Sequence, residues 1–171
     1  KEINAAAVRN AKKAAAGKAC VAAGIGPLER MVEPLGPISF EQAMDCYREW
    51  AEVVVGEGCD LLLFETFSDI RELKAAIIAA REISADIPIQ AQLTYEEGKQ
   101  TVSGTTPECA AIVLSALDVQ IIGTNCSTGP KDLVPVVTHY YAHSDKYISV
   151  LPNAGLPQLI EGNMVFNASP N

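Results

Sequence analysis

Residues 60–94 read DLLLFETFSDIRELKAAIIAAREISADIPIQAQLT, and their order of apolar and polar residues indicates the fold class. Residues 60–65 are an apolar run that ends in the carboxylate of Glu65, which is typical of a buried strand. An amphipathic helix follows, with Ser68 as its predicted N-terminal cap. Residues 88–94 form a second apolar strand. A strand, a helix and a strand in this order predict a βαβ unit with parallel strands.

The same alternation continues on both sides of this unit. Three more strands are predicted, at residues 19–23, 119–123 and 147–151. Four more helices are predicted, at residues 1–17, at residues 39–57 behind an S-x-x-Q capping box, from a Thr106 cap onward and at residues 131–143. Residues 95–106 are expected to form a loop with Gly98 and Gly104. The strands are apolar on both faces, as expected for strands that helices cover.

Strict alternation leaves two α/β architectures open, an open doubly wound sheet or part of a (β/α)8 barrel. A barrel needs eight strands and about 250 residues, and this chain has 171 residues with five predicted strands. The chain begins with a helix that no strand precedes, and it stops shortly after a strand. Its length fits one domain over residues 1–171.

Charge and cysteine content exclude several classes of function. The chain has 13 basic and 21 acidic residues, for a net charge of −8, and no basic run, so we expect no nucleic-acid or membrane-surface partner. No apolar stretch has transmembrane length, and no signal peptide is recognised. The five cysteines form no C-x-x-C pair, which favours a reducing, cytoplasmic location. Four of them are predicted to be small core residues, namely Cys20, Cys46, Cys59 and Cys109.

Candidate functional residues follow from the predicted strand ends, because both architectures place their sites there. Glu65 ends an apolar run, and a carboxylate in that position needs an ion pair, solvation or a ligand. Cys126 follows another strand, beside polar Asn125, so a nucleophile or metal ligand competes with a core role. The two histidines, His139 and His143, lie late in a helix and are interpreted as surface residues rather than metal ligands.

Several strand-end strings together resemble the homocysteine S-methyltransferase family, and within it the homocysteine-binding barrel of cobalamin-dependent methionine synthases. The strings are EPLGP at 33–37, ETFSD at 65–69, QLTY at 92–95, SGTTP at 103–107, GTNCS at 123–127 and PNAG at 152–155. The resemblance covers essentially the whole chain. It implies a TIM barrel present only in part, with strands three to seven here and the first two strands and the last strand missing.

The resemblance also implies the site and its cofactors. Cys126 matches the first of three cysteines that bind zinc, and the other two would lie beyond residue 171. Glu65 matches the carboxylate that holds the homocysteine ammonium, and Gly24 lies where main-chain amides meet the substrate carboxylate. Asn153 matches a residue that approaches the zinc when substrate is absent, and Asn125 belongs behind the zinc ligand at the edge of the substrate site. Relatives often have Gly-Ser where this chain has Ala-Gly at 23–24. The chain therefore lacks a serine hydroxyl at the position expected to bind the substrate carboxylate.

The implied function is methylation of homocysteine to methionine, with methylcobalamin or methyltetrahydrofolate acting through further domains of a longer chain. A cobalamin-independent relative that uses S-methylmethionine or betaine is the first alternative. The second is a non-catalytic fragment that binds an amino acid.

Overall fold

The computed structural model describes residues 1–96, 100–155 and 157–166, and its main body is a five-stranded sheet covered by helices. All neighbouring strands are parallel, in the order β1-β2-β3-β4-β5. The strands are β1 (Ala22–Ile25), β2 (Leu61–Phe67), β3 (Ile89–Leu93), β4 (Ile121–Asn125) and β5 (Tyr147–Leu151). The helices are α1 (Glu2–Ala15), α2 (Phe40–Gly56), α3 (Ile70–Ile83), α4 (Pro107–Ser115) and α5 (Pro130–His143). In these described ranges no helix is long and apolar enough to cross a membrane.

The predicted alternation of strands and helices is confirmed, and local capping signals explain most helix starts. Ser39 and Gln42 form the predicted capping box, in which each side chain accepts the other residue's backbone N–H. Thr106 caps α4 through its hydroxyl. The predicted cap of α3 was wrong: the Asp69 side chain, rather than that of Ser68, accepts the Arg71 N–H. A carboxylate can stabilise a helix N-terminus more strongly than a hydroxyl, because its negative charge also interacts favourably with the positive end of the helix dipole.

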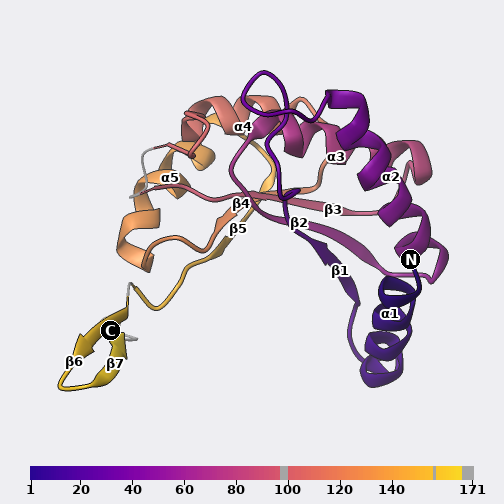
Figure 1. Cartoon of the computed structure of the whole chain (residues 1–171), viewed down its shortest axis with the longest axis horizontal. Coiled ribbons are helices and arrows are strands. Elements are labelled where there is room, and N and C mark those ends of the chain that lie inside the picture. The colour runs from indigo at the N-terminus through magenta and orange to yellow at the C-terminus, as the bar shows by residue number, and fades with distance from the viewer. Residues whose placement is uncertain (97–99, 156, 167–171) are drawn as a thin grey trace.

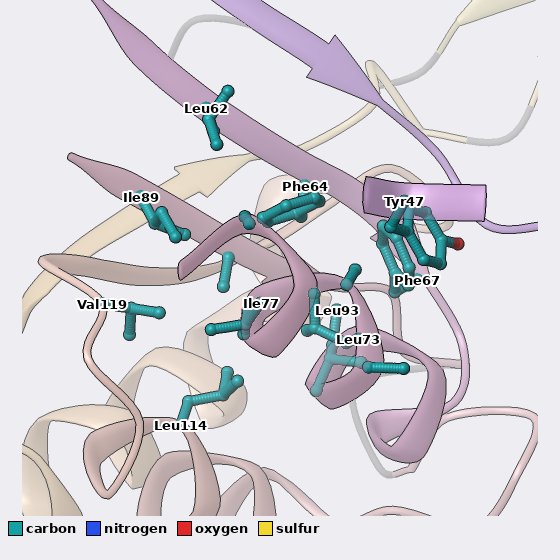
Figure 2. Close-up of a cluster of buried hydrophobic side chains, with 14 of the residues drawn as sticks. Tyr47, Leu62, Phe64, Phe67, Leu73, Ile77, Ile89, Leu93, Leu114 and Val119 are labelled. Atoms are coloured by element: carbon teal, nitrogen blue, oxygen red, sulfur yellow. The ribbon is translucent and has the colours of Figure 1, made fainter. Parts of the chain in front are cut away.

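The core lies between the sheet and the helices that Figure 1 shows along one side of it. Phe64 and Phe67 of β2 point to this side and contact Tyr47 of α2, with ring centroids 6.3 and 5.8 Å apart. Figure 2 shows these rings beside Leu73 and Ile77 of α3. All are fully or almost fully buried. Their burial fixes which face of each strand meets the helices.

The opposite face of the strands carries polar as well as apolar side chains, so the prediction of apolar residues on both faces holds only in part. Gln90 and Gln92 each donate from Nε2 to the Ser149 hydroxyl at 3.0 Å. Since successive side chains of a strand alternate, residues 89, 91 and 93 of β3 face the helices while these glutamines face the inner side. Helices cover one face only, so the inner face can hold hydrogen-bonding side chains.

One element was not predicted from the sequence. The chain forms an additional antiparallel hairpin, β6 (Pro157–Ile160) and β7 (Asn163–Phe166), which Figure 1 shows apart from the sheet. The two residues between its strands, Glu161 and Gly162, both have positive φ, as a tight hairpin turn requires. In the predicted 95–106 loop, residues 97–99 with Gly98 lie outside the described residues.

The cysteine prediction holds only for Cys59, which is buried. Cys20, Cys46 and Cys109 are exposed, and all five cysteines are free. Cys46 and Cys109 lie on the outer faces of α2 and α4, where the helix period, rather than side-chain polarity, decides exposure.

Candidate functional site

Parallel pairing brings the carboxyl ends of the five strands to the same end of the sheet, here called the rim. All five residues predicted for the site belong to the rim. Gly24 lies in β1, Glu65 lies near the end of β2, and Asn125 is the last residue of β4. Cys126 follows directly, and Asn153 follows β5. The fold thus gathers a carboxylate, a thiol and two carboxamides from separate segments of the chain.

Glu65 of β2 and Gly24 of β1 lie on neighbouring strands, close to each other. A Cβ atom added to Gly24 would stand 3.1 Å from Glu65 Oε1, so the missing side chain leaves room for the carboxylate. Glu65 is half-buried. Within the described ranges, no lysine, arginine or histidine approaches it to ion-pair distance. A carboxylate in this setting is available to a cationic ligand group.

Cys126 is half-buried, and its sulfur and main chain are both held. Asn125 Nδ2 donates to Cys126 Sγ at 3.2 Å, and the Cys126 N–H donates to the Leu151 carbonyl at 3.0 Å.

The glycine of the GTNCS string, Gly123, is required for steric reasons. A Cβ on Gly123 would meet the Ser149 carbonyl oxygen at 2.2 Å, so only glycine allows β4 and β5 to approach this closely.

Two threonines that sequence reasoning left out also belong to the rim. The Thr66 N–H donates to Asn125 Oδ1 at 2.8 Å, and Thr94 Oγ1 donates to the Asn125 carbonyl at 2.6 Å. Asn125 is buried, with 2% of its surface exposed, so protein contacts occupy its side chain. The only sequence signal for these threonines was their presence in the ETFSD and QLTY strings.

Asn153 is exposed, and its N–H donates to the Thr128 carbonyl at 3.1 Å. That bond joins the segment after β5 to the segment after Cys126. His139 and His143 lie late in α5, which begins at the rim and runs away from it. His139 Nδ1 is 2.9 Å from a Glu108 carboxylate oxygen of α4. The histidines therefore belong to the helical surface, as the sequence predicted.

The resemblance implies a zinc site, which needs several ligand side chains close together. No group of three or more His, Cys, Asp or Glu side chains among them could hold a metal ion. Cys126 fits one position of a thiolate site, because its sulfur is at the rim, is oriented by an N–H donor and forms no disulfide. The described residues thus fit one ligand of such a site rather than a complete set.

Glu72 is a buried carboxylate that sequence reasoning missed. It lies in the first turn of α3 with 3% of its surface exposed, and its Oε1 accepts the Leu28 N–H at 2.6 Å and the Tyr47 hydroxyl at 2.7 Å. Burial raises the pKa of Glu72, and the neighbouring hydrogen bonds only partly oppose this effect. These bonds fasten the segment after β1, next to Gly24, to the first turn of α3.

Glu72→Gln is expected to flatten the dependence of the unfolding free energy on pH. A raised carboxyl pKa in the folded state stabilises the protein below the ordinary value of 4.5, and this contribution is lost as pH rises through the raised value. Glutamine keeps an acceptor for Leu28 and Tyr47 but cannot ionise. Urea unfolding at a series of pH values measures the effect, and curves that stay parallel to wild type would contradict it. Glu72→Ala, the control, leaves each buried donor unsatisfied at a cost of about 1–3 kcal/mol.

Comparison with known proteins identifies the family of the chain. The family model described as "Homocysteine S-methyltransferase" matches residues 1–171. Methionine synthase of Mycobacterium tuberculosis is 33% identical over 146 residues, which are 83% of this chain and 12% of that protein. The chain thus spans about an eighth of the length of this curated relative.

Solved structures match the same fold. The homocysteine methyltransferase MmuM from Escherichia coli in its apo form gives a TM-score of 0.72 at 21% identity, over 86% of this chain and 56% of that chain. Its metallated form also gives 0.72, at 20% identity, over 86% and 55%. The likeness confirms the fold predicted from the sequence, an α/β barrel present in part. With a family match along all of its 171 residues, the chain belongs to the homocysteine S-methyltransferase family.

Proposed function

We propose that this chain is the part of a methionine synthase-like enzyme that binds homocysteine and presents its sulfur for methylation. One observation carries the proposal: a half-buried thiol, Cys126, and the carboxylate of Glu65 lie on the same rim of a sheet whose family methylates homocysteine. Homocysteine carries an ammonium, a carboxylate and a thiol. The rim offers an acceptor for the first and a metal ligand for the last.

The proposed roles are those that the family resemblance implies, and the chemistry of the residues is compatible with them. Glu65 binds the substrate ammonium through charge-assisted hydrogen bonds, and its place beside Gly24 brings the substrate's α-carbon to the end of β1. Main-chain amides near Gly24 bind the substrate carboxylate. Cys126 supplies one thiolate to zinc. Asn153, whose N–H binds the segment after Cys126, approaches the metal when substrate is absent. The Asn125 side chain donates a hydrogen bond to Cys126 Sγ and so orients the sulfur.

Zinc bound by thiolates would hold the substrate sulfur in its anionic form near neutral pH. The substrate sulfur then supplies the electron pair of the new sulfur–carbon bond, and the methyl donor keeps the pair of the bond that breaks. Glu65 and the amides near Gly24 fix the amino acid end of the substrate, so the sulfur points in one direction. The curated relatives are much longer than this chain, and we propose that further domains supply the methyl group, through methylcobalamin and methyltetrahydrofolate, and that the remaining zinc ligands come from a longer polypeptide.

An assay of the full-length gene product with different methyl donors tests the proposal. Methionine should form from homocysteine with methyltetrahydrofolate and cobalamin, and should not form with S-methylmethionine or betaine. Product with either of the latter two donors would establish the cobalamin-independent alternative. If no donor gives methionine while homocysteine still binds, the fragment reading, a non-catalytic amino-acid-binding unit, replaces the enzyme.

A further inference from the structure

The backbone at the rim adopts a conformation that side chains normally avoid. Among the described residues five non-glycine positions have positive φ, and three of them are at the rim, namely Thr66 at 64°, Cys126 at 59° and Ser127 at 61°. A β-branched residue such as threonine is especially unfavourable in this region. Residues held in this way require compensating contacts and cluster at functional sites. The contacts that stabilise this conformation of Thr66 therefore indicate which part of the site it supports.

Those contacts form a closed set between the ends of β2 and β4. The Thr66 N–H donates to Asn125 Oδ1 at 2.8 Å, and Asn125 Nδ2 donates to Thr66 Oγ1 at 2.8 Å and to Cys126 Sγ at 3.2 Å. Both amide hydrogens of Asn125 are used in this way. The Thr66 hydroxyl hydrogen remains available, and Thr66 Oγ1 is 3.8 Å from Cys126 Sγ. The sulfur thus lies beside two donors that also bind each other.

The set spans an intervening strand, which makes it a positioning device rather than a local turn. Strand β3 lies between β2 and β4. From its end, Thr94 donates to the Asn125 carbonyl, so that the ends of β2 and β3 both hold the residue next to Cys126. The main chain of Cys126 is tied in turn to β5 through Leu151. Rotation of the Cys126 side chain would break contacts with Asn125 and Thr66 together.

We propose that Thr66 is a positioning residue for Cys126, and that its hydroxyl, together with the Asn125 carboxamide, fixes the direction of Sγ toward the metal. The inference rests on the proposed function, in which Cys126 binds zinc. A hydroxyl is needed because one group must accept from Asn125 and donate to sulfur, and serine or threonine can do both. Valine has nearly the shape of threonine and can do neither.

The test compares Thr66→Val, Thr66→Ser and Thr66→Gly in the full-length protein, by competition of Zn²⁺ with a chelator. Outer-shell changes at metal sites typically cost roughly 10–100-fold in affinity, and that loss is expected for valine and glycine. Serine should retain affinity within about threefold, because it keeps the hydroxyl. With Co²⁺ in place of zinc, the sulfur-to-metal charge-transfer band should shift for valine and stay unchanged for serine.

Glycine separates positioning from stability, because it relieves the positive φ of Thr66. The metal-free Thr66→Gly protein should melt at or above the wild-type temperature while it binds zinc more weakly. Wild-type zinc affinity in both the valine and glycine proteins would overturn the inference, and so would equal losses in the valine and serine proteins. If the valine protein does not fold, the glycine and serine proteins carry the test. Cys126→Ser is measured in parallel: if it retains zinc, the proposed function fails, whereas zinc loss there with unaffected Thr66 variants refutes only the role of Thr66.

Discussion

Cys126→Ser in the full-length protein is expected to abolish stoichiometric zinc binding and methionine formation together. A serine hydroxyl is a far poorer zinc ligand than a thiolate, and the loss should exceed the roughly 10–100-fold effects of outer-shell changes. The fold should survive, because Cys126 is half-buried at a strand end and lies outside the hydrophobic core. Metal analysis after dialysis, a methionine assay and a melting curve measure the three quantities.

The matched control for this prediction is Cys46→Ser. Cys46 is an exposed cysteine on α2 and lies outside the rim, so its replacement should leave zinc content and activity at wild-type levels. Equal zinc content in the Cys126→Ser protein and wild type would remove Cys126 from the metal site.

Glu65→Gln is expected to weaken homocysteine binding by roughly ten- to a hundredfold. A charge-assisted hydrogen bond contributes on the order of 1.5–3 kcal/mol, and 1.4 kcal/mol corresponds to a factor of ten. Zinc affinity should stay unchanged, since Glu65 is not proposed as a ligand. The melting temperature should also change little, because no described cation forms an ion pair with Glu65 that the substitution would break. Calorimetric titration with homocysteine measures the effect.

Two further variants sharpen the test of Glu65. Gly24→Ala would place a Cβ 3.1 Å from Glu65 Oε1, so the carboxylate must shift by a few tenths of an ångström, and homocysteine affinity should fall without loss of the fold. Glu52→Gln, on the exposed side of α2, is the matched control and should bind homocysteine normally. Normal homocysteine affinity of the Glu65→Gln protein would exclude Glu65 from the substrate site, and a large drop in its melting temperature would identify a structural role.

Short-range signals carried the prediction of the fold. The strand at residues 147–151 was predicted with its observed limits, and the capping box at Ser39 and the N-cap at Thr106 located two helix starts. These features depend on a few neighbouring residues, whose side chains satisfy the backbone N–H groups of the first helical turn. Where two adjacent residues could cap the same helix, as with Ser68 and Asp69, the sequence alone did not distinguish them.

Contacts between distant segments were beyond sequence reasoning. Glu72 appeared to be an ordinary acidic residue in a first helical turn, yet it is buried against Tyr47 and Leu28, which are 25 and 44 residues away along the chain. The polar inner face around Ser149 was missed for the same reason. An apolar strand does not itself reveal whether helices cover one of its faces or both.

Hydrophobic period and capping are local properties, so they were enough to predict the alternation of strands and helices, the parallel sheet and the residues at the strand ends. How those residues meet depends on the packing of the whole fold. The contacts of Thr66 with Asn125 and Cys126 join positions 59 and 60 residues apart. They depend on the pairing of β2, β3 and β4, which includes a register shift between Phe64 and Phe67, and on positive φ angles at Thr66 and Cys126. Strand register and left-handed backbone are set by packing of the whole sheet, so no short stretch of sequence specifies them.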